Sequence, residues 1–305
     1  MPRPFRPTIA ANQITPPDIF FNRRQFVAGL GLAIAAPPLL LGQDTSGMLT
    51  PPFERPDVFP TERNGTYALP KSIDQAMTPR EVAAAHNNFY ELLPGRGGPA
   101  WQHAEAFEPA PWKVEIVGEC AKPRTLDLDD LFAFAHEERV YHFRCVERWA
   151  MNVPWSGFPL AKLLASVEPT ADARYVRFVS ANRPKQMPGI PASSHYPWPY
   201  HEGLRMDEAM HELAMVVTGV YGEPLLKQHG APVRIIVPWK YGYKNPKSIV
   251  RIELMREEPS TFWQVQAHEY GFISNINPNI PHPRWSQETS YWLHDQSPFP
   301  TQIYN

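Results

Sequence analysis

The sequence predicts an α+β domain in which mixed β-sheets are combined with short helices. Segments that alternate apolar and polar residues, as half-buried strands do, are interleaved irregularly with short segments that carry helix-start signals. The chain has no regular strand–helix–strand alternation, no glycine-rich nucleotide fingerprint and no repeat of fixed period. Its 36 prolines are spread over 305 residues, which predicts long ordered loops.

The first predicted helix begins after residue 77 and ends near 86–88. Thr78 is the expected N-cap, Pro79 suits the first helical position, and Glu81 completes a capping box. The segment 45–70 before it is rich in proline and lacks periodicity, so we expect an extended arm that lies on the domain.

The next elements are a strand and a second helix. Residues 112–116 alternate apolar and charged side chains, which indicates a half-buried strand. Asp127 is the expected N-cap of the second helix and Asp130 lies at its N3 position. A strand over 140–143 then leads directly to Cys145.

The rest of the chain is predicted as follows. Residues 155–159 form a turn that feeds a short helix with apolar residues between 160 and 167 on one face. A long loop covers 182–200. Further strands are expected over 175–180, 214–220, 233–237 and 248–254, with a short helix over 207–213.

The N-terminus carries a twin-arginine pattern. Arg23 and Arg24 are followed by Phe26 and by an uncharged apolar run over 26–41, shorter than the roughly 20 residues of a membrane-spanning helix. A membrane anchor or a chance arginine pair are the alternatives. The combination favours a cleaved twin-arginine (Tat) export signal over residues 1–44, a single domain over 45–305 and a periplasmic location.

Composition limits the class of partner. Without residues 1–43 the net charge falls from −2 to about −5, which gives no support for nucleic-acid binding.

Cys145 is the most informative single residue of the sequence. It follows a strand and is flanked by Arg144 and Arg148, whose charges favour a thiolate, so it suits a metal ligand or a nucleophile. A disulfide with Cys120 is the structural alternative.

Other familiar sites lack support. The chain has neither the Gly-x-Ser-x-Gly nor the His-Glu-x-x-His pattern. His195, His201 and Glu202 share one predicted loop, but no second group of ligands completes a zinc set.

A single thiolate is too small a ligand set for a bare metal ion, so an organic cofactor would have to complete it. An anionic cofactor needs cationic partners, and the densest candidates are Arg234, Lys240, Lys244 and Lys247. The alternative is a solvated basic face at the strand ends, and from physics alone the two interpretations stay open.

Several segments resemble the sulfite oxidase family of molybdoenzymes. The segments 230–234, 238–242 and 247–249 resemble its pterin-binding loops. Further matches to the pattern of its protein-methionine-sulfoxide-reducing branch are Asn87-Asn88-Phe89-Tyr90-Glu91, Phe143-Arg144-Cys145-Val146-Glu147, Gln186-Met187-Pro188-Gly189, Glu202-Gly203-Leu204-Arg205 and His282-Pro283-Arg284-Trp285-Ser286-Gln287. The resemblance covers nearly all of the chain after the export signal and implies a sulfite-oxidase-type molybdopterin-binding domain.

The resemblance implies a molybdenum centre with one molybdopterin that carries no nucleotide. Cys145 would be the metal ligand, and Asn88 and Glu147 would lie beside the metal on the substrate side; a helix end and a turn are their structural alternatives. Ser180 stands where the family often has Thr, and His229 where Asn is common. The residues implied to bind the cofactor are Asn87, Tyr90, Glu91, Cys145, Ser180, His229, Arg234, Asn245, Pro246 and Lys247.

The implied activity is the reduction of methionine sulfoxide in oxidised periplasmic proteins, a reversible lesion. Because the chain has no haem-attachment motif or iron–sulfur cysteine set, a haem b membrane subunit fed by the quinone pool is the implied electron donor. The alternatives are a sulfite dehydrogenase with the same cofactor and a non-catalytic exported domain with a Cys120–Cys145 disulfide.

Overall fold

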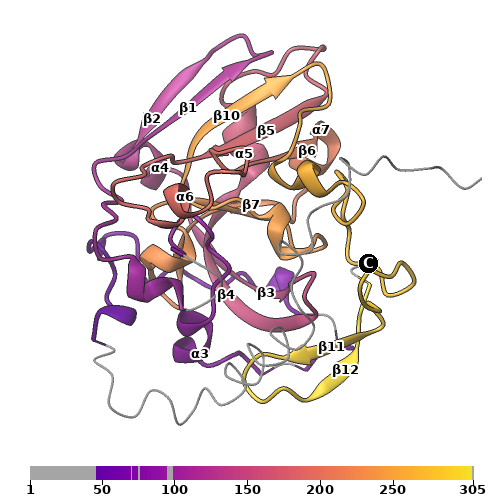
Figure 1. The fold of residues 1–305 in the computed structure, drawn as a ribbon. Coiled ribbons are helices and arrows are strands. Elements are labelled where there is room, and N and C mark those ends of the chain that lie inside the picture. The colour runs from indigo at the N-terminus through magenta and orange to yellow at the C-terminus, as the bar shows by residue number, and fades with distance from the viewer. Residues whose placement is uncertain (1–45, 70, 75, 95–98, 304–305) are drawn as a thin grey trace, which may run out of the picture. The chain divides into compact units, whose positions relative to one another are not determined.

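A five-stranded sheet forms the upper half of the domain in the view of Figure 1. The computed structural model describes residues 46–303 except 70, 75 and 95–98, so the predicted export signal over 1–44 lies outside the described residues. β1 and β10 pair in parallel, and the other neighbours are antiparallel. In spatial order the strands are β2 (Arg124–Asp127), β1 (Lys113–Gly118), β10 (Ile249–Met255), β5 (Tyr175–Ser180) and β6 (His201–Arg205).

A seven-stranded sheet forms the lower half. Its main path is β12 (Pro298–Pro300), β11 (Thr289–Trp292), β4 (Trp149–Pro159), β7 (Met215–Val220) and β8 (Glu223–Pro224). In addition, β3 (Glu137–Arg144) pairs with β4, and β9 (Arg234–Ile236) pairs with β7. β7 is buried along its whole length, and its residues are apolar or small apart from Thr218.

Short helices connect and cover the sheets. The α-helices are α3 (Arg80–Ala85), α4 (Leu128–Phe132), α5 (Leu160–Ala165), α6 (Gly189–Ala192) and α7 (Met206–Ala209). The 3-10 helices are η2 (Ser46–Met48), η3 (Gly65–Tyr67), η4 (Ala100–His103), η5 (Lys227–His229), η6 (Gly242–Lys244) and η7 (Phe262–Gln266). No helix among the described residues is long and apolar enough to cross a membrane.

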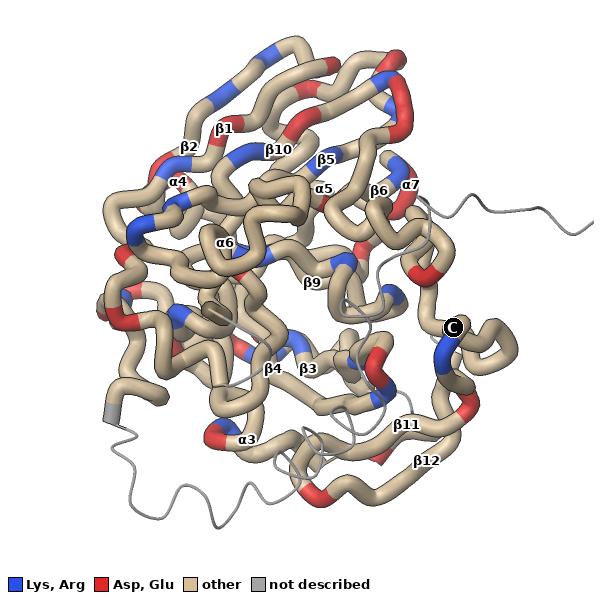
Figure 2. The backbone as a smooth tube through the Cα atoms, viewed as in Figure 1, with Lys and Arg blue, Asp and Glu red and all other residues tan. Residues whose placement is uncertain are grey.

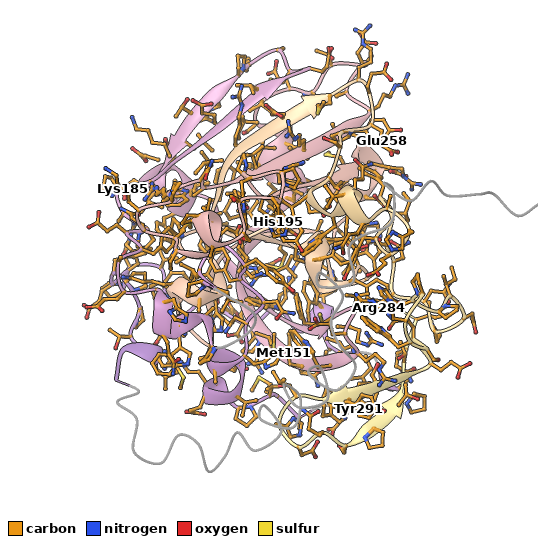
Figure 3. All side chains as sticks on the ribbon, viewed as in Figure 1. Met151, Lys185, His195, Glu258, Arg284 and Tyr291 are labelled. Carbon is orange, nitrogen blue, oxygen red and sulfur yellow. The ribbon has the colours of Figure 1, made fainter. Side chains whose placement is uncertain are left out.

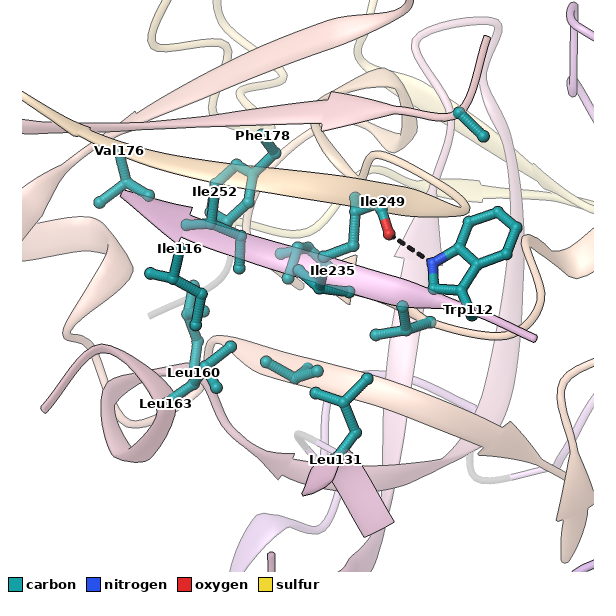
Figure 4. Close-up of a cluster of buried hydrophobic side chains, with 14 of the residues drawn as sticks. Trp112, Ile116, Leu131, Leu160, Leu163, Val176, Phe178, Ile235, Ile249 and Ile252 are labelled. Carbon is teal, nitrogen blue, oxygen red and sulfur yellow. Dashed lines mark hydrogen bonds between the residues drawn. The ribbon is translucent and has the colours of Figure 1, made fainter. Parts of the chain in front are cut away.

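The largest core cluster packs one face of the five-stranded sheet against α4, α5 and β9 (Figure 4). Ile116, Phe178 and Ile252 come from the sheet, and Leu160 and Ile235 pack against them. Less buried residues alternate with the core residues in these strands, and Figure 2 shows both signs of charge along β1, β5 and β10. The alternation of core and charged residues in these strands therefore follows from one buried and one solvated face.

Most predicted elements are confirmed, including the strand over 175–180. Asp127 caps α4 and forms a capping box with Asp130. Two predictions at helix starts and turns are wrong. The hydroxyl of Thr78 accepts a hydrogen bond from Asn152 N at 3.1 Å instead of capping α3, and residues 155–159 continue β4 instead of forming a turn.

Candidate functional site

Cys145 lies in the loop 145–148, which joins β3 to β4. Cys145 N donates to Trp149 O at 3.0 Å, and Arg148 N donates to Cys145 O at 3.0 Å. Arg148 closes the turn in the left-handed region, with φ of 76°. Two long paired strands thus fix the thiol at the end of the seven-stranded sheet, where it is buried.

The thiol lines a pocket with about 740 Å³ of free space, its open mouth included. Eight of the residues predicted from the sequence line it together: Asn88, Tyr90, Glu91, Cys145, Glu147, Asn245, Pro246 and Lys247. Four others lie outside its lining: Asn87, Ser180, His229 and Arg234.

Asn88 and Glu147 meet at the thiol. Asn88 Nδ2 donates to Glu147 Oε2 at 2.9 Å and lies 3.9 Å from Cys145 Sγ. Glu147 Oε2 also accepts a hydrogen bond from Trp149 Nε1 at 3.3 Å and lies 4.0 Å from the sulfur. An amide and a carboxylate of fixed orientation therefore flank the sulfur.

The expected activation of Cys145 by neighbouring arginines is not what the structure shows. Burial raises the pKa of the Cys145 thiol, the charge of Glu147 adds to this, and Arg144 opposes it only in part. The Arg148 guanidinium lies over the Tyr291 ring, 5.0 Å from its centroid. A buried thiol beside a carboxylate is a poor nucleophile, whereas a bound cation would stabilise its thiolate as a ligand.

The segment after α3 supplies the next wall of the pocket. Asn87 Nδ2 donates to Ala83 O and Ala84 O at 3.3 and 2.8 Å, so this amide satisfies the free carbonyls at the end of α3. Gly189 of α6 packs directly on the segment: its N–H donates to Glu91 O at 2.8 Å.

Glu91 is buried, Lys247 is half-buried, and the two groups attract each other. Burial raises the pKa of Glu91 and lowers that of Lys247, and in each case the attraction of the other group opposes the shift. Lys247 Nζ donates to Asn88 O at 3.1 Å. The ammonium thus lies beside the residue that contacts the thiol.

Arg234 is a buried cation without an ion pair among the described residues. Burial lowers its pKa to about 9. Its guanidinium donates to two carbonyls, His229 O at 2.8 Å and Asn245 O at 3.3 Å, while its Nε has no partner in the described part of the chain. A buried charge in this state calls for an anion.

His229 and Ser180 add two further buried polar atoms. His229 Nε2 lies 3.2 Å from Ala83 O, which makes Nε2 the donor and Nδ1 an acceptor. Burial lowers the pKa of His229 to about 3, so the ring is neutral. Nδ1 of His229 and Oγ of Ser180 have no hydrogen-bond partner within the described residues. These atoms fit a ligand that has both donors and acceptors.

Two of the four predicted cations are engaged elsewhere. Lys240 Nζ contacts Glu208 and Lys244 Nζ contacts Glu202, both at 2.6 Å and both buried. They hold the segment 238–247 to α7 and β6 and do not face a ligand. The predicted basic cluster therefore reduces to Arg234 and Lys247.

The sequence suggests the aromatic loop 194–200 and the C-terminal Tyr-Trp segment as rims of the site, whereas the rest of the aromatic wall of the pocket was not predicted. Trp149, Tyr243, Trp263 and Tyr270 line it, together with Tyr200 at the end of the predicted loop 182–200. They come from distant parts of the chain, so no local pattern joins them. Figure 3 shows Tyr291 on β11, and this residue and its neighbour Trp292 do not line the pocket.

The alternative sites are excluded for the described residues. Cys120 and Cys145 are both free, so the disulfide alternative is wrong. No group of three or more His, Cys, Asp or Glu side chains in the described ranges could hold a metal ion alone. His201 and Glu202 belong to β6 and not to the loop that contains His195.

Fold and site together fit a domain that binds an anionic organic cofactor: a buried thiol lines the pocket, and the buried Arg234 has no ion pair among the described residues. The family model described as oxidoreductase molybdopterin binding domain matches residues 101–263. The chain belongs to this family, and the predicted fold class is confirmed.

Within the family, the chain is similar to two protein-methionine-sulfoxide reductase catalytic subunits named MsrP. The one from Ralstonia nicotianae (strain ATCC BAA-1114 / GMI1000) is 45% identical over 283 residues, which cover 92% of this chain and 83% of the relative. The one from Burkholderia mallei (strain ATCC 23344) is 46% identical over 284 residues, which cover 92% and 84%. The resemblance predicted from the sequence is thereby confirmed.

Among solved structures, the sulfane dehydrogenase SoxCD from Paracoccus pantotrophus aligns with a TM-score of 0.44 and 17% identity, over 72% of this chain and 59% of that chain.

Proposed function

We propose that this protein is a molybdenum-dependent oxidoreductase that reduces methionine sulfoxide in oxidised periplasmic proteins to methionine. The observation that carries the proposal is the placement of Cys145 Sγ in the pocket, within 4.0 Å of both Asn88 and Glu147. The identity of about 45% to catalytic subunits that bear this activity in their names supports it.

The cofactor in this proposal is molybdenum with one molybdopterin and no nucleotide. Cys145 would ligate the metal, while Arg234 and Lys247 would offset the negative charge of the pterin group. Ser180 Oγ and His229 Nδ1, both buried and without partners in the described structure, would hydrogen-bond to it. When bound, the group supplies the two-electron chemistry that accepts an oxygen atom from a sulfoxide.

The chain itself orients the substrate and moves protons. Methionine sulfoxide, two electrons and two protons give methionine and water. Asn88 Nδ2 would donate to the sulfoxide oxygen, and Glu147, which Asn88 and Trp149 orient, would pass the protons. The aromatic wall around Trp263 and Tyr270 excludes water and contacts the apolar part of the methionine side chain.

Sulfite oxidation with the same cofactor is the competing function. A small dianion requires cationic partners on the substrate side. Among the described residues that line the pocket, Lys247 is the one lysine or arginine, and this proposal assigns it to the cofactor, while Glu147 beside the thiol would repel sulfite. This arrangement favours a neutral sulfoxide substrate.

Export and electron supply complete the proposal. The signal over 1–44 would direct the folded protein to the periplasm, where a haem b membrane subunit, paired with this chain as a heterodimer, would deliver electrons from the quinone pool. The role would be repair of oxidised proteins. Replacing Arg23 and Arg24 by Lys should leave the protein in the cytoplasmic fraction, and export of that variant would contradict the proposal.

Turnover assays with an artificial electron donor test the reaction. We expect the molybdenum-loaded protein to reduce free and casein-bound methionine sulfoxide and to show no sulfite oxidation. Sulfite oxidation without sulfoxide reduction would replace the proposed function by its alternative.

A further inference from the structure

The C-terminal segment 282–301 holds the cysteine loop from outside the pocket. Val146 O accepts two hydrogen bonds from it, one from Trp285 Nε1 and one from Gln287 Nε2, both at 2.9 Å. β11 continues the contact, because Tyr291 N donates to Arg148 O at 2.9 Å. The loop 145–148 is therefore bonded along its backbone by residues about 140 positions away in the sequence.

Arg144 connects the same segment to Cys145 itself. Its guanidinium is buried and makes no ion pair among the described residues. It donates to the carbonyl oxygen of Cys145, to Gln287 Oε1 at 2.8 Å and to Ser290 Oγ at 2.8 Å. These acceptors are neutral, so no carboxylate among the described residues cancels the positive charge of Arg144 next to Cys145.

Gln287 belongs to both sets of contacts. Its oxygen accepts from Arg144 Nη2, and its nitrogen donates to Val146 O. The side chain is 1% exposed, so neither bond competes with water. One amide thus fixes the residues on both sides of Cys145 in the sequence.

We propose that Gln287 is a positioning residue that sets the orientation of the Cys145 ligand and keeps the buried charge of Arg144 beside it. It touches neither substrate nor cofactor and acts through the loop 145–148. The inference rests on the proposed function only in assigning Cys145 as the metal ligand, and the contacts themselves need no substrate.

Hydrogen exchange in the loop 145–148 tests whether Gln287 holds this loop in position. Gln287→Leu removes both bonds with little change in volume. In the full-length protein we expect the amides of Cys145 and Arg148 to exchange about tenfold faster than in the wild type, as expected when a bond to a charged group is lost. Gln296→Leu is the matched control, because Gln296 lies in the same segment and bonds only to Trp292 O and Leu293 O. Equal exchange in the two variants would overturn the proposal.

The redox potential of a second variant tests whether Gln287 keeps the charge of Arg144 beside Cys145. This measurement also keeps the proposal testable if Gln287→Leu does not fold. Gln287→Glu keeps the shape and places a carboxylate on Arg144, so the positive field at Cys145 falls. Because reduction adds negative charge, we expect the midpoint potential of the molybdenum centre, followed by its paramagnetic resonance signal, to shift to lower values. An unchanged potential and signal would overturn the proposal. Neither readout needs sulfoxide turnover, and hydrogen exchange needs no molybdenum either, so it tests the position of the loop even if the proposed function fails.

Discussion

Arg234 carries a buried positive charge with no ion pair among the described residues, and the half-buried Lys247 is attracted by Glu91. Lys247 bonds to a backbone carbonyl and is attracted by Glu91, while Arg234 bonds to two carbonyls. Burial lowers the pKa of both groups. A bound anion would stabilise both charges, so these two residues report on the cofactor.

Lys247→Met should weaken retention of the cofactor. The substitution removes the ammonium and keeps the length of the apolar side chain. We expect molybdenum and pterin content after purification to fall about tenfold or more, as loss of a charge-assisted contact implies. Lys185→Met at an exposed position is the control and should retain the wild-type content. Full retention in Lys247→Met would remove this residue from the site.

His142 should make the protein sensitive to acid. Burial lowers its pKa to about 4, against an ordinary value of 6.5, while its Nδ1 contacts Asn152 Oδ1 at 3.0 Å. Between these two pH values the unfolded chain binds a proton that the folded chain does not. The free energy of unfolding therefore falls as the pH drops from 6.5 to about 4, by at most about 3 kcal/mol.

Denaturant unfolding of cofactor-free His142→Gln checks this dependence. The variant should be less stable at neutral pH but should lose less stability than the wild type on acidification. His195→Gln, at an exposed ring, should keep the full pH dependence. Identical slopes in all three proteins would show that His142 does not contribute.

At the scale of elements, two buried ion pairs position the pocket wall formed by the segment 238–247. Lys240 bonds to Glu208 of α7, and Lys244 bonds to Glu202 of β6. Because the segment has little regular structure apart from η6, these pairs fix residues 245–247 against the five-stranded sheet. Their role is structural, although the sequence placed them with the ligand-binding cations.

Removing one member of such a pair should destabilise the fold strongly. Lys244→Met leaves Glu202 buried and unpaired, which costs about 3–5 kcal/mol of unfolding free energy. The double variant Lys244→Met, Glu202→Leu should recover much of this loss. The exposed pair of Lys122 and Glu168 provides the control, since Lys122→Met should change stability by less than about 1 kcal/mol. Denaturant midpoints measure the stability of all three variants, and a double variant no more stable than Lys244→Met would contradict the account.

Gly189 controls how closely α6 approaches the segment that holds Tyr90 and Glu91. A Cβ at this position would lie 1.8 Å from Tyr90 O. Gly189→Ala should therefore displace that segment and lower both stability and cofactor content. Gly65→Ala, with nothing within 4 Å of the added carbon, should leave both unchanged. The molybdenum content and the thermal unfolding midpoint are measured for both variants. Wild-type values in Gly189→Ala would contradict this role of Gly189.

Local sequence signals predicted the elements that are stabilised mainly by residues close together in the sequence. The capping box of α4 and the alternating strand over 175–180 are examples. The error at 155–159 has a tertiary cause. Gly157 permits close strand approach, since a Cβ there would lie 2.0 Å from Val216 O, and the sequence alone cannot distinguish this need from a turn.

At the scale of the molecule, the pocket draws its walls from the loop 145–148, the segment after α3, the segment 238–247 and the region around η7. The sequence identified the first three because each carries residues of a recognisable motif. It did not identify Trp149, Trp263 and Tyr270 as one wall, because aromatic residues in proline-rich loops are equally suited to packing. The contacts of Gln287 with Arg144 and Val146 depend on the pairing of β11 with β4, and this pairing has no local sequence signature.

Metal analysis of the wild type and Cys145→Ser tests the central claim most directly. The account predicts that the purified wild type contains stoichiometric molybdenum and reduces methionine sulfoxide, and that Cys145→Ser, folded as judged by circular dichroism, loses that activity. Wild-type protein without molybdenum, or a Cys145→Ser variant with full cofactor and full activity, would contradict it.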